Sequence, residues 1–258
     1  MIRVRRLKSM PSRAPNSLAL LFVTPRTPCQ KLGVRFFFDI MNYYLILDSD
    51  FLILFVMPYT QEINHLIKAD PILAIAIRRL GPCGLKPTHG EPFEELGESI
   101  LYQQLSGKAA ATITGRFKNL FGGQWPGAGA LLATPNAKIR GVGISNAKML
   151  ALQDLAKHAQ RGKLKMAALE KLADDALVEH VDKIRGIGRW TAEMFLIFTL
   201  GRPDIFPLDD LGIQKGLQKL FGYKKLPAKR TMLKHAAKWQ PFRTIASWYL
   251  WRIADENK

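Results

Sequence analysis

From about residue 60 onward, the chain is divided into short apolar stretches that carry their own helix start and stop signals. Asp70-Pro71 is typical of an N-cap followed by a first-turn proline, and Gly81 is placed to end the helix that follows. No stretch beyond residue 57 alternates apolar and polar residues with a period of two between turn signals, as a half-buried strand would. The sequence therefore predicts an all-α fold.

The same signals predict the remaining helices. Phe93, Leu96 and Ile100 share one face of a helix that ends near Leu105, and Ser106 is expected to cap a helix through Phe117. Further helices are expected after Thr134-Pro135 up to Gly141, from Ser145 to about Gln160, and over 166–174, 175–184, 189–200, 210–221, 228–239 and 242–254.

Residues 1–56 differ in character from the rest of the chain. The first 36 residues contain eight basic residues and no acidic one, and the two apolar runs that follow are broken by Asp39, Asp48 and Asp50. A transit peptide would suit this composition, but the stretch lacks a clear amphipathic period or cleavage site. A membrane span is disfavoured, since each aspartate costs about 2.5–3.5 kcal/mol of insertion at a helix centre. We therefore expect residues 1–56 to be an extension outside a working domain at residues 57–258.

The net charge of +17 favours a polyanionic partner, and residues 57–258 keep 30 of the 38 basic and 18 of the 21 acidic residues. Membrane surfaces and RNA attract basic chains equally well, so motifs must identify the partner. Two cysteines, Cys29 and Cys83, are too few for a disulfide framework or a four-cysteine cluster, and the five histidines lack zinc-site spacing. We expect no metal, no cofactor and a reducing, cytoplasmic setting.

Residues 181–192 place a Gly-x-Gly turn between two short helices. Two close glycines permit positive φ and leave backbone amides uncovered, so the start of the second helix can face a phosphate. An ordinary tight turn would use the same glycines, but Lys183, Arg185 and Arg189 surround this one and favour DNA. Gly141-Val142-Gly143, followed by Ser145 and Lys148, predicts a second helix pair that packs similarly.

Four segments carry a family resemblance. They are Ser99-Ile100-Leu101-Tyr102-Gln103-Gln104-Leu105-Ser106, Gly141-Val142-Gly143-Ile144-Ser145, the hairpin continuing to Phe206-Pro207-Leu208-Asp209-Asp210, and Trp239-x-Pro241-x-Arg243 leading to Tyr249-Leu250-Trp251-Arg252. In this order they resemble the helix-hairpin-helix DNA glycosylases, and among them the 3-methyladenine DNA glycosylase II branch, over roughly residues 60–254. The resemblance implies a two-lobed all-α fold with the active site in the cleft between the lobes. The N-terminal β domain of larger bacterial members has no counterpart in residues 1–56.

The resemblance also implies a chemistry: an alkylated base is flipped out of double-stranded DNA and released. Cleaving an N-glycosidic bond creates positive charge on the sugar, so a fixed carboxylate is needed beside it. Asp210 matches the catalytic aspartate of the family. An aspartate here would also serve as a plain helix cap. We assign the cap to Asp209 and the catalytic role to Asp210.

An alkylated purine is cationic, and aromatic rings attract such a ring by roughly 0.5–2 kcal/mol per good contact. By family position, the expected base pocket contains Trp190, Trp251 and Tyr102, with Met194 where larger bacterial members have a tyrosine. Trp239 and Trp248 are as easily core residues. The family fills the gap left by the base from the loop after the Gln-Gln segment, so either Gln104 or Leu105 is expected to be the wedge.

DNA backbone contacts are expected from Arg185, Gly186, Ile187, Gly188, Arg189 and Thr191. Arg243 also matches a family position, where it would either orient the catalytic loop or contact DNA. Relatives that nick the strand carry a nucleophilic lysine one residue after the position of Arg189, and this chain has Trp190 there. The resemblance thus predicts hydrolysis by water, leaving an abasic site in an intact strand.

Two other functions stay open at this point. The hairpin also occurs in DNA-binding modules that are not enzymes, although Asp210 and the pocket tryptophans argue against that class. A glycosylase for oxidised or mispaired bases would share the fold and the aspartate but lack the tryptophan-rich C-terminal segment. In each case we expect a monomer that binds double-stranded DNA and no membrane.

Overall fold

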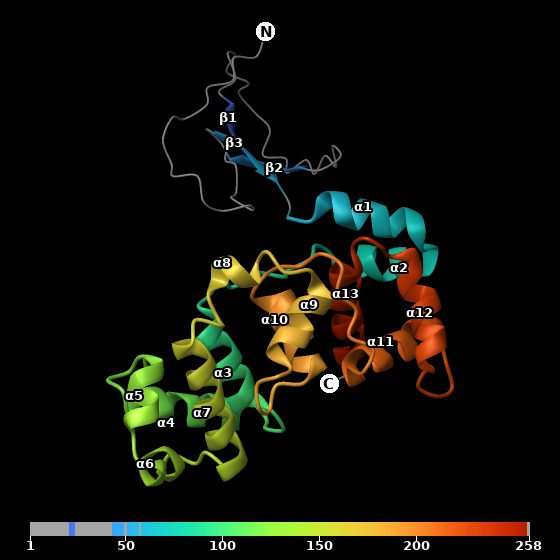
Figure 1. Cartoon of the computed structure of the whole chain (residues 1–258). Coiled ribbons are helices and arrows are strands. Elements are labelled where there is room, and N and C mark those ends of the chain that lie inside the picture. Colours follow the sequence, from blue (N-terminus) through green and yellow to red (C-terminus); the bar gives the residue numbers. More distant parts are fainter. Residues whose placement is uncertain (1–20, 24–42, 49–50, 57, 257–258) are drawn as a thin grey trace. The chain divides into compact units, whose positions relative to one another are not determined.

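The computed structural model describes residues 21–23, 43–48, 51–56 and 58–256 (Figure 1). The chain divides into two compact units, Met1–Gly84 and Leu85–Lys258. In the first unit, strands β1 (Leu21–Val23), β2 (Tyr43–Asp48) and β3 (Phe51–Val56) form an antiparallel sheet in the order β1-β3-β2. Residues 58–256 contain helices and no strand, which confirms the all-α prediction for the part of the chain to which it applied.

Two helices complete the described part of the first unit, α1 (Thr60–Ala69) and α2 (Pro71–Leu80). The Asp70 carboxylate accepts hydrogen bonds from the backbone N–H groups of Ile72 and Leu73, and Gly81 ends α2. The cap and stop predicted for this helix are therefore confirmed.

The second unit contains eleven helices within residues 85–256. They are α3 (Pro92–Tyr102), α4 (Gly107–Asn119), α5 (Ala128–Ala133), α6 (Asn136–Gly141), α7 (Asn146–Gln160), α8 (Met166–Leu169), α9 (Asp174–Val181), α10 (Arg189–Phe198), α11 (Leu211–Phe221), α12 (Lys229–Lys238) and α13 (Arg243–Asp255). Ser106 and Ser145 cap α4 and α7 as predicted. The helix predicted over 166–174 is a single turn, and α5 was not predicted.

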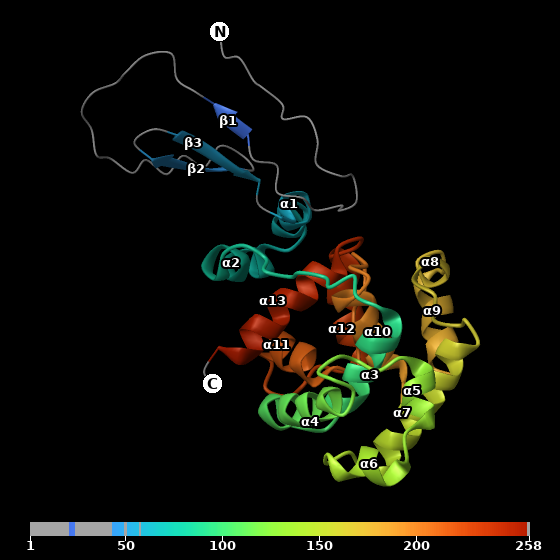
Figure 2. The same ribbon diagram turned by 90° about the vertical axis from the view of Figure 1, so that its left-hand side faces the viewer.

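Figure 2 shows the helices of the second unit, coloured in chain order from α3 to α13. Helices α3, α5 and α6 pack on α7, α4 packs on α3, and α9 packs on α10, while α11 and α13 make the most extensive contact. Helix α3 also packs against α10. Trp239, Tyr249, Phe117 and Phe195 are the largest fully buried side chains of this core. No helix among the described residues is long and apolar enough to cross a membrane.

Candidate active site

Asp210 lies at the start of α11, where its carboxylate is held by three hydrogen bonds. Oδ1 accepts from the backbone N–H of Ile213 and from the indole Nε1 of Trp251, each at 2.8 Å. Oδ2 accepts from the indole Nε1 of Trp190, also at 2.8 Å. Only 9% of the residue is exposed. The site therefore presents one oriented carboxylate at a helix N-terminus, where negative charge is favoured.

The assignment of the helix cap to Asp209 is wrong. Asp210 is the N-cap of α11, because its own side chain accepts the bond from Ile213. Asp209 points away and forms an exposed ion pair with Lys229 at the start of α12. Lys229, Trp190 and Trp251 all lie in distant segments of the chain. Their contacts determine which of the two neighbouring aspartates is buried.

Trp251 reaches Asp210 from α13 and is fixed by the residues around it. Its ring stacks on Phe198 with centroids 5.5 Å apart. A side chain at Gly212 would place its Cβ 2.7 Å from Cδ1 of Trp251 and 3.0 Å from Oδ1 of Asp210. Only glycine leaves room for this pair at that position.

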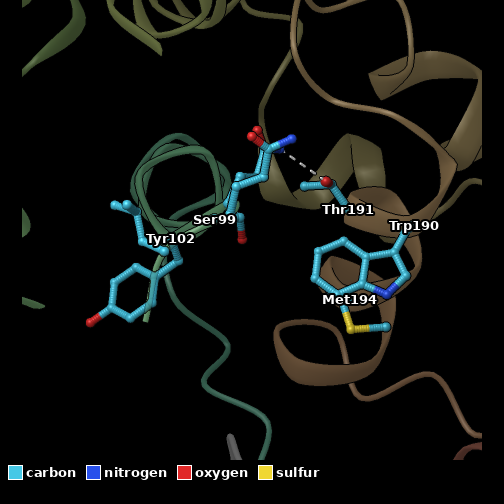
Figure 3. A pocket seen from close by; sticks show the side chains of 8 residues that line it. Ser99, Tyr102, Trp190, Thr191 and Met194 are labelled. Carbon is cyan, nitrogen blue, oxygen red and sulfur yellow. Dashed lines mark hydrogen bonds between the residues drawn. The ribbon is translucent and has the colours of Figure 1, made fainter. Parts of the chain in front are cut away.

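A cavity of about 520 Å³ opens where α3 and α10 meet. It is lined by Ser99, Tyr102, Gln103, Gln104, Leu105, Trp190, Thr191 and Met194. Figure 3 shows Ser99 and Tyr102 on the α3 side, with Trp190 and Met194 facing them from α10. Its volume lies in the range of small-molecule sites, about 300–1,000 Å³.

The structure brings together most, but not all, of the residues expected to form the base pocket. Tyr102, Trp190 and Met194 line the cavity, as do both wedge candidates, Gln104 and Leu105. Trp251 is not among its lining residues, because its stacking on Phe198 and its bond to Asp210 hold it behind the carboxylate. Trp239 is fully buried and belongs to the core.

The hairpin joins α9 to α10 through residues 182–188. Gly186 has φ +79°, and a Cβ there would lie 2.9 Å from that of Ala151. Gly188 begins α10 without any side-chain cap, which leaves the first-turn amides of the helix to solvent or a ligand. Ile187 and Thr191 are buried, so the hairpin offers its backbone rather than these side chains.

The basic residues of the hairpin differ in how they are engaged. The exposed Arg185 is tied to Asp154 only through its backbone N–H, at 2.9 Å. Arg189 instead donates to Asp175 at 3.2 Å and to Glu193 at 3.1 Å. Two carboxylates thus already neutralise the guanidinium of Arg189, whereas that of Arg185 is available to a phosphate.

Glu193 is a buried acid beside the site that the sequence did not single out. It is 7% exposed, and burial is the main cause that raises its pKa. Arg189 lowers this pKa, while the nearby carboxylates of Asp209 and Asp210 raise it. The spacing of Glu193 from Arg189 predicts an i,i+4 ion pair, but nothing local reveals that α10 turns this acid inward.

Arg243 pairs with Asp204 through two parallel bonds, Nε to Oδ1 at 2.7 Å and Nη2 to Oδ2 at 2.9 Å. The adjacent Thr244 donates to the carbonyl of Arg202 and accepts from the N–H of Ile205. The start of α13 therefore holds the loop that leads to Asp210. Of the two roles considered for Arg243, this geometry favours orienting that loop.

Ser99 and Gln103 were also not predicted as site residues. Ser99 lines the cavity and shares a helical face with Tyr102, three residues later, which is a signal available in the sequence. The Gln103 side chain donates to the carbonyl of Gly186 and to the hydroxyl of Thr191. These partners lie more than eighty residues away, so no local pattern could have indicated them.

Comparison with known proteins extends these observations. The family model described as "HhH-GPD superfamily base excision DNA repair protein" matches residues 98–241. The DNA-3-methyladenine glycosylase 1 of Schizosaccharomyces pombe is 40% identical over 173 residues, which cover 65% of this chain and 76% of that protein.

Two solved structures are similar to this one. An S. pombe 3-methyladenine DNA glycosylase in complex with abasic DNA has a TM-score of 0.69 at 36% identity. The match covers 74% of this chain and 95% of the S. pombe chain. A DNA-3-methyladenine glycosidase from Bacillus halodurans has a TM-score of 0.70 at 35% identity, and the match covers 75% of this chain and 89% of the B. halodurans chain.

Proposed function

The chain belongs to the HhH-GPD superfamily of base excision DNA repair proteins, and on this premise we propose that it is a monofunctional glycosylase that releases alkylated purines from duplex DNA. The similar proteins named as 3-methyladenine DNA glycosylases support this substrate class. The single observation that carries the proposal is the Asp210 carboxylate, bonded by Trp190 and Trp251 beside a cavity of suitable size.

The hydrogen bonds of Asp210 leave one position for substrate. Each carboxylate oxygen accepts at about two positions. Oδ1 uses both, for Ile213 and Trp251, while Oδ2 uses one, for Trp190. The remaining acceptor direction of Oδ2 is the one that stabilises the cationic sugar as the N-glycosidic bond breaks. Water then attacks the sugar, and the abasic strand stays intact.

The cavity receives the flipped base. Trp190 and Tyr102 offer aromatic faces that attract a cationic ring, and the Met194 sulfur adds a polarizable wall. Trp190 also donates to the catalytic carboxylate, so one side chain touches both the base site and the sugar site. A base that binds against Trp190 is thereby aligned with Asp210.

The amides at the start of α10, together with Arg185, bind a DNA phosphate near the lesion. Gly186 and Gly188 allow the close approach of the backbone, and the amides of Arg189 and Thr191 lie in the same segment, whereas the N–H of Ile187 already donates to the carbonyl of Ile184 at 3.0 Å. These contacts hold any sequence equally, because they read phosphates and no base edges. Gln104 or Leu105 fills the space vacated by the base.

Residues 1–56 are proposed to lie outside the catalytic domain, because the family match covers 98–241 and the site residues lie between 99 and 251. The protein is proposed to act as a monomer in a reducing compartment that contains DNA.

The experiment that tests the function is a release assay on duplex DNA methylated with a simple alkylating agent. Released bases are identified by chromatography, and the product strand is treated with alkali to reveal abasic sites. We expect free methylated purines and alkali-labile sites. A protein that binds the duplex but releases no base would be a DNA-binding module, and release of oxidised bases alone would point to the other glycosylase class.

A further inference from the structure

The turn that follows α3 has an unfavourable backbone conformation. The N–H of Leu105 donates to the carbonyl of Tyr102 at 3.3 Å, which closes a four-residue turn. Gln103 has φ −51° and ψ 132°, and Gln104 follows with φ +57°. This is a type II turn, whose third residue is normally glycine or asparagine. A glutamine in the left-handed region is strained, and such residues persist where the surroundings hold them.

Two side chains, those of Lys148 and Gln103, hold the Tyr102–Leu105 turn. Lys148, on α7, donates from Nζ to the carbonyls of Leu101 at 2.7 Å and Gln103 at 2.8 Å. Both acceptors lie at the C-terminus of α3, where a cation is favoured. Lys148 is half-buried, and burial lowers its pKa.

The second of these side chains, Gln103, links the turn to the hairpin proposed to bind DNA. The side-chain amide of Gln103 donates to the carbonyl of Gly186 at 2.8 Å and to the hydroxyl of Thr191 at 3.2 Å. Figure 3 shows the bond to Thr191 crossing from α3 to α10. Gly186 belongs to the hairpin turn itself, and Thr191 to the first turn of α10. The turn and the hairpin therefore keep a fixed relative position.

We propose that Lys148 and Gln103 are positioning residues that hold the Tyr102–Leu105 turn, which carries both expected wedge residues, Gln104 and Leu105, ready for base flipping. This inference rests on the proposed function. Gln104 and Leu105 are both exposed at the turn and both line the cavity, so the turn lies between solvent and base site. Because Gln103 bonds the hairpin, docking of the hairpin on a phosphate places the turn at a set distance along the strand. The strain in the turn is compensated before DNA binds, and flipping needs no rearrangement of the protein.

The test compares one lesion in two contexts, using full-length protein. A 7-methylguanine is placed either opposite cytosine in a duplex or in a one-nucleotide bulge, where little stacking and pairing remain to be broken. Single-turnover release and DNA affinity are measured for Gln103→Met and Lys148→Met. Lys148→Arg serves as the conservative variant, and the exposed Lys171→Met serves as the control for loss of charge.

For the paired lesion, both methionine variants are expected to lose about 10- to 100-fold in release rate, the factor equivalent to one hydrogen bond from a charged donor or two from a neutral one. For the bulged lesion the loss stays within about threefold, because flipping is no longer the costly step. DNA affinity and melting temperature should change little for Gln103→Met. Lys148→Arg should recover most of the rate, and Lys171→Met should match the wild type. Equal losses in both contexts, or none, would overturn the proposal.

A second readout separates failure of this inference from failure of the proposed function. A 2-aminopurine is placed beside a stable abasic analogue, and its fluorescence reports insertion of the turn without any bond cleavage. We expect the wild type to change this signal and both methionine variants to change it less at saturating protein. Should Lys148→Met not fold, Gln103→Met alone decides the outcome in both assays. A wild type that changes the signal but releases no base would refute the glycosylase function, while the proposed positioning role of Lys148 and Gln103 would still hold.

Discussion

The indole nitrogen of Trp190 lies 2.8 Å from Oδ2 of Asp210, so an aromatic side chain occupies the place beside the carboxylate where a nucleophilic lysine would act. An indole N–H donates a hydrogen bond but cannot form a Schiff base. This relationship underlies the proposed product, an abasic site in an intact strand, and the predictions below start from it.

The first prediction concerns Asp210 itself. Asp210→Asn should fold and bind DNA, because asparagine caps a helix about as well as aspartate, and only the bond to Trp190 is exchanged for a poorer contact. The rate of base release should fall by about 10²–10³ or more, since a preorganised charge opposite the developing cation is lost. Single-turnover release, with DNA affinity measured separately, checks this. Asp209→Asn is the matched control: it breaks only the exposed pair with Lys229, so its activity should persist.

The second prediction concerns the product. Borohydride added during turnover should trap no protein–DNA adduct, because Trp190 supplies no amine. The product strand should remain uncut until it is treated with alkali. An adduct in yield comparable to that of a strand-nicking glycosylase assayed alongside would show that another lysine reaches the sugar.

The third prediction separates the two arginines of the hairpin. Binding to undamaged duplex should be independent of sequence and fall steeply with salt. Arg185→Ala should weaken binding to all duplexes alike and reduce the slope of log K against log salt by about one phosphate contact. Arg189→Ala should reduce this slope less, because Asp175 and Glu193 already neutralise its guanidinium. Equal slopes for the two variants would contradict this distinction.

The fourth prediction follows from the buried acid on α10. Burial raises the pKa of Glu193 above its ordinary value of 4.5, so the folded state holds the proton more tightly than the unfolded state. The associated stability is present below about pH 4.5 and is lost as the pH rises through the raised pKa. Glu193→Gln stays neutral and still accepts from Arg189. The melting temperature of the variant relative to the wild type should therefore rise as the pH increases above 4.5, and this difference should become constant above the raised pKa. The exposed Glu179→Gln is the matched control for removing a glutamate charge from the surface.

The fifth prediction uses glycines inside helices. Gly216 meets the backbone carbonyl of Leu250, where an added Cβ would lie 2.2 Å from the oxygen. Gly216→Ala should therefore separate α11 from α13 and destabilise the protein by about 1–3 kcal/mol, the usual cost of overpacking. Gly115, in α4, has open space around it. Gly115→Ala should stabilise by about 0.5–1 kcal/mol through helix propensity alone, and thermal unfolding distinguishes the two signs.

Local signals predicted the helices well because a cap is decided by a few neighbouring atoms. Asp70, Ser106 and Ser145 each bond an amide two or three residues away, and each could be identified from the sequence. Asp209 and Asp210 offered the same local chemistry twice. Contacts with Lys229, Trp190 and Trp251 settled the choice, and none of these is local.

The arrangement of the site was predictable only where the family motif fixes it. Tyr102, Trp190 and Met194 lie around one cavity, but Trp251 lies behind the carboxylate, because Phe198 stacks on it. The bond from Gln103 to Gly186 spans 83 residues, and helical periodicity says nothing about such a pair. Contacts between helices that are distant in the sequence could be identified only from the structure.

One residue serves as both cap and candidate catalyst, and this has a genetic consequence. The codons for aspartate and asparagine differ by a single guanine-to-adenine change at the first position. Because asparagine keeps the cap of α11, such a change at position 210 would leave the stability of the fold nearly unchanged, and the protein would not be degraded as misfolded. The altered gene would encode an abundant protein that still occupies damaged sites without clearing them. Beside a normal copy, such a protein would compete with the active enzyme for the same damaged sites, an effect that a protein unable to fold would not have.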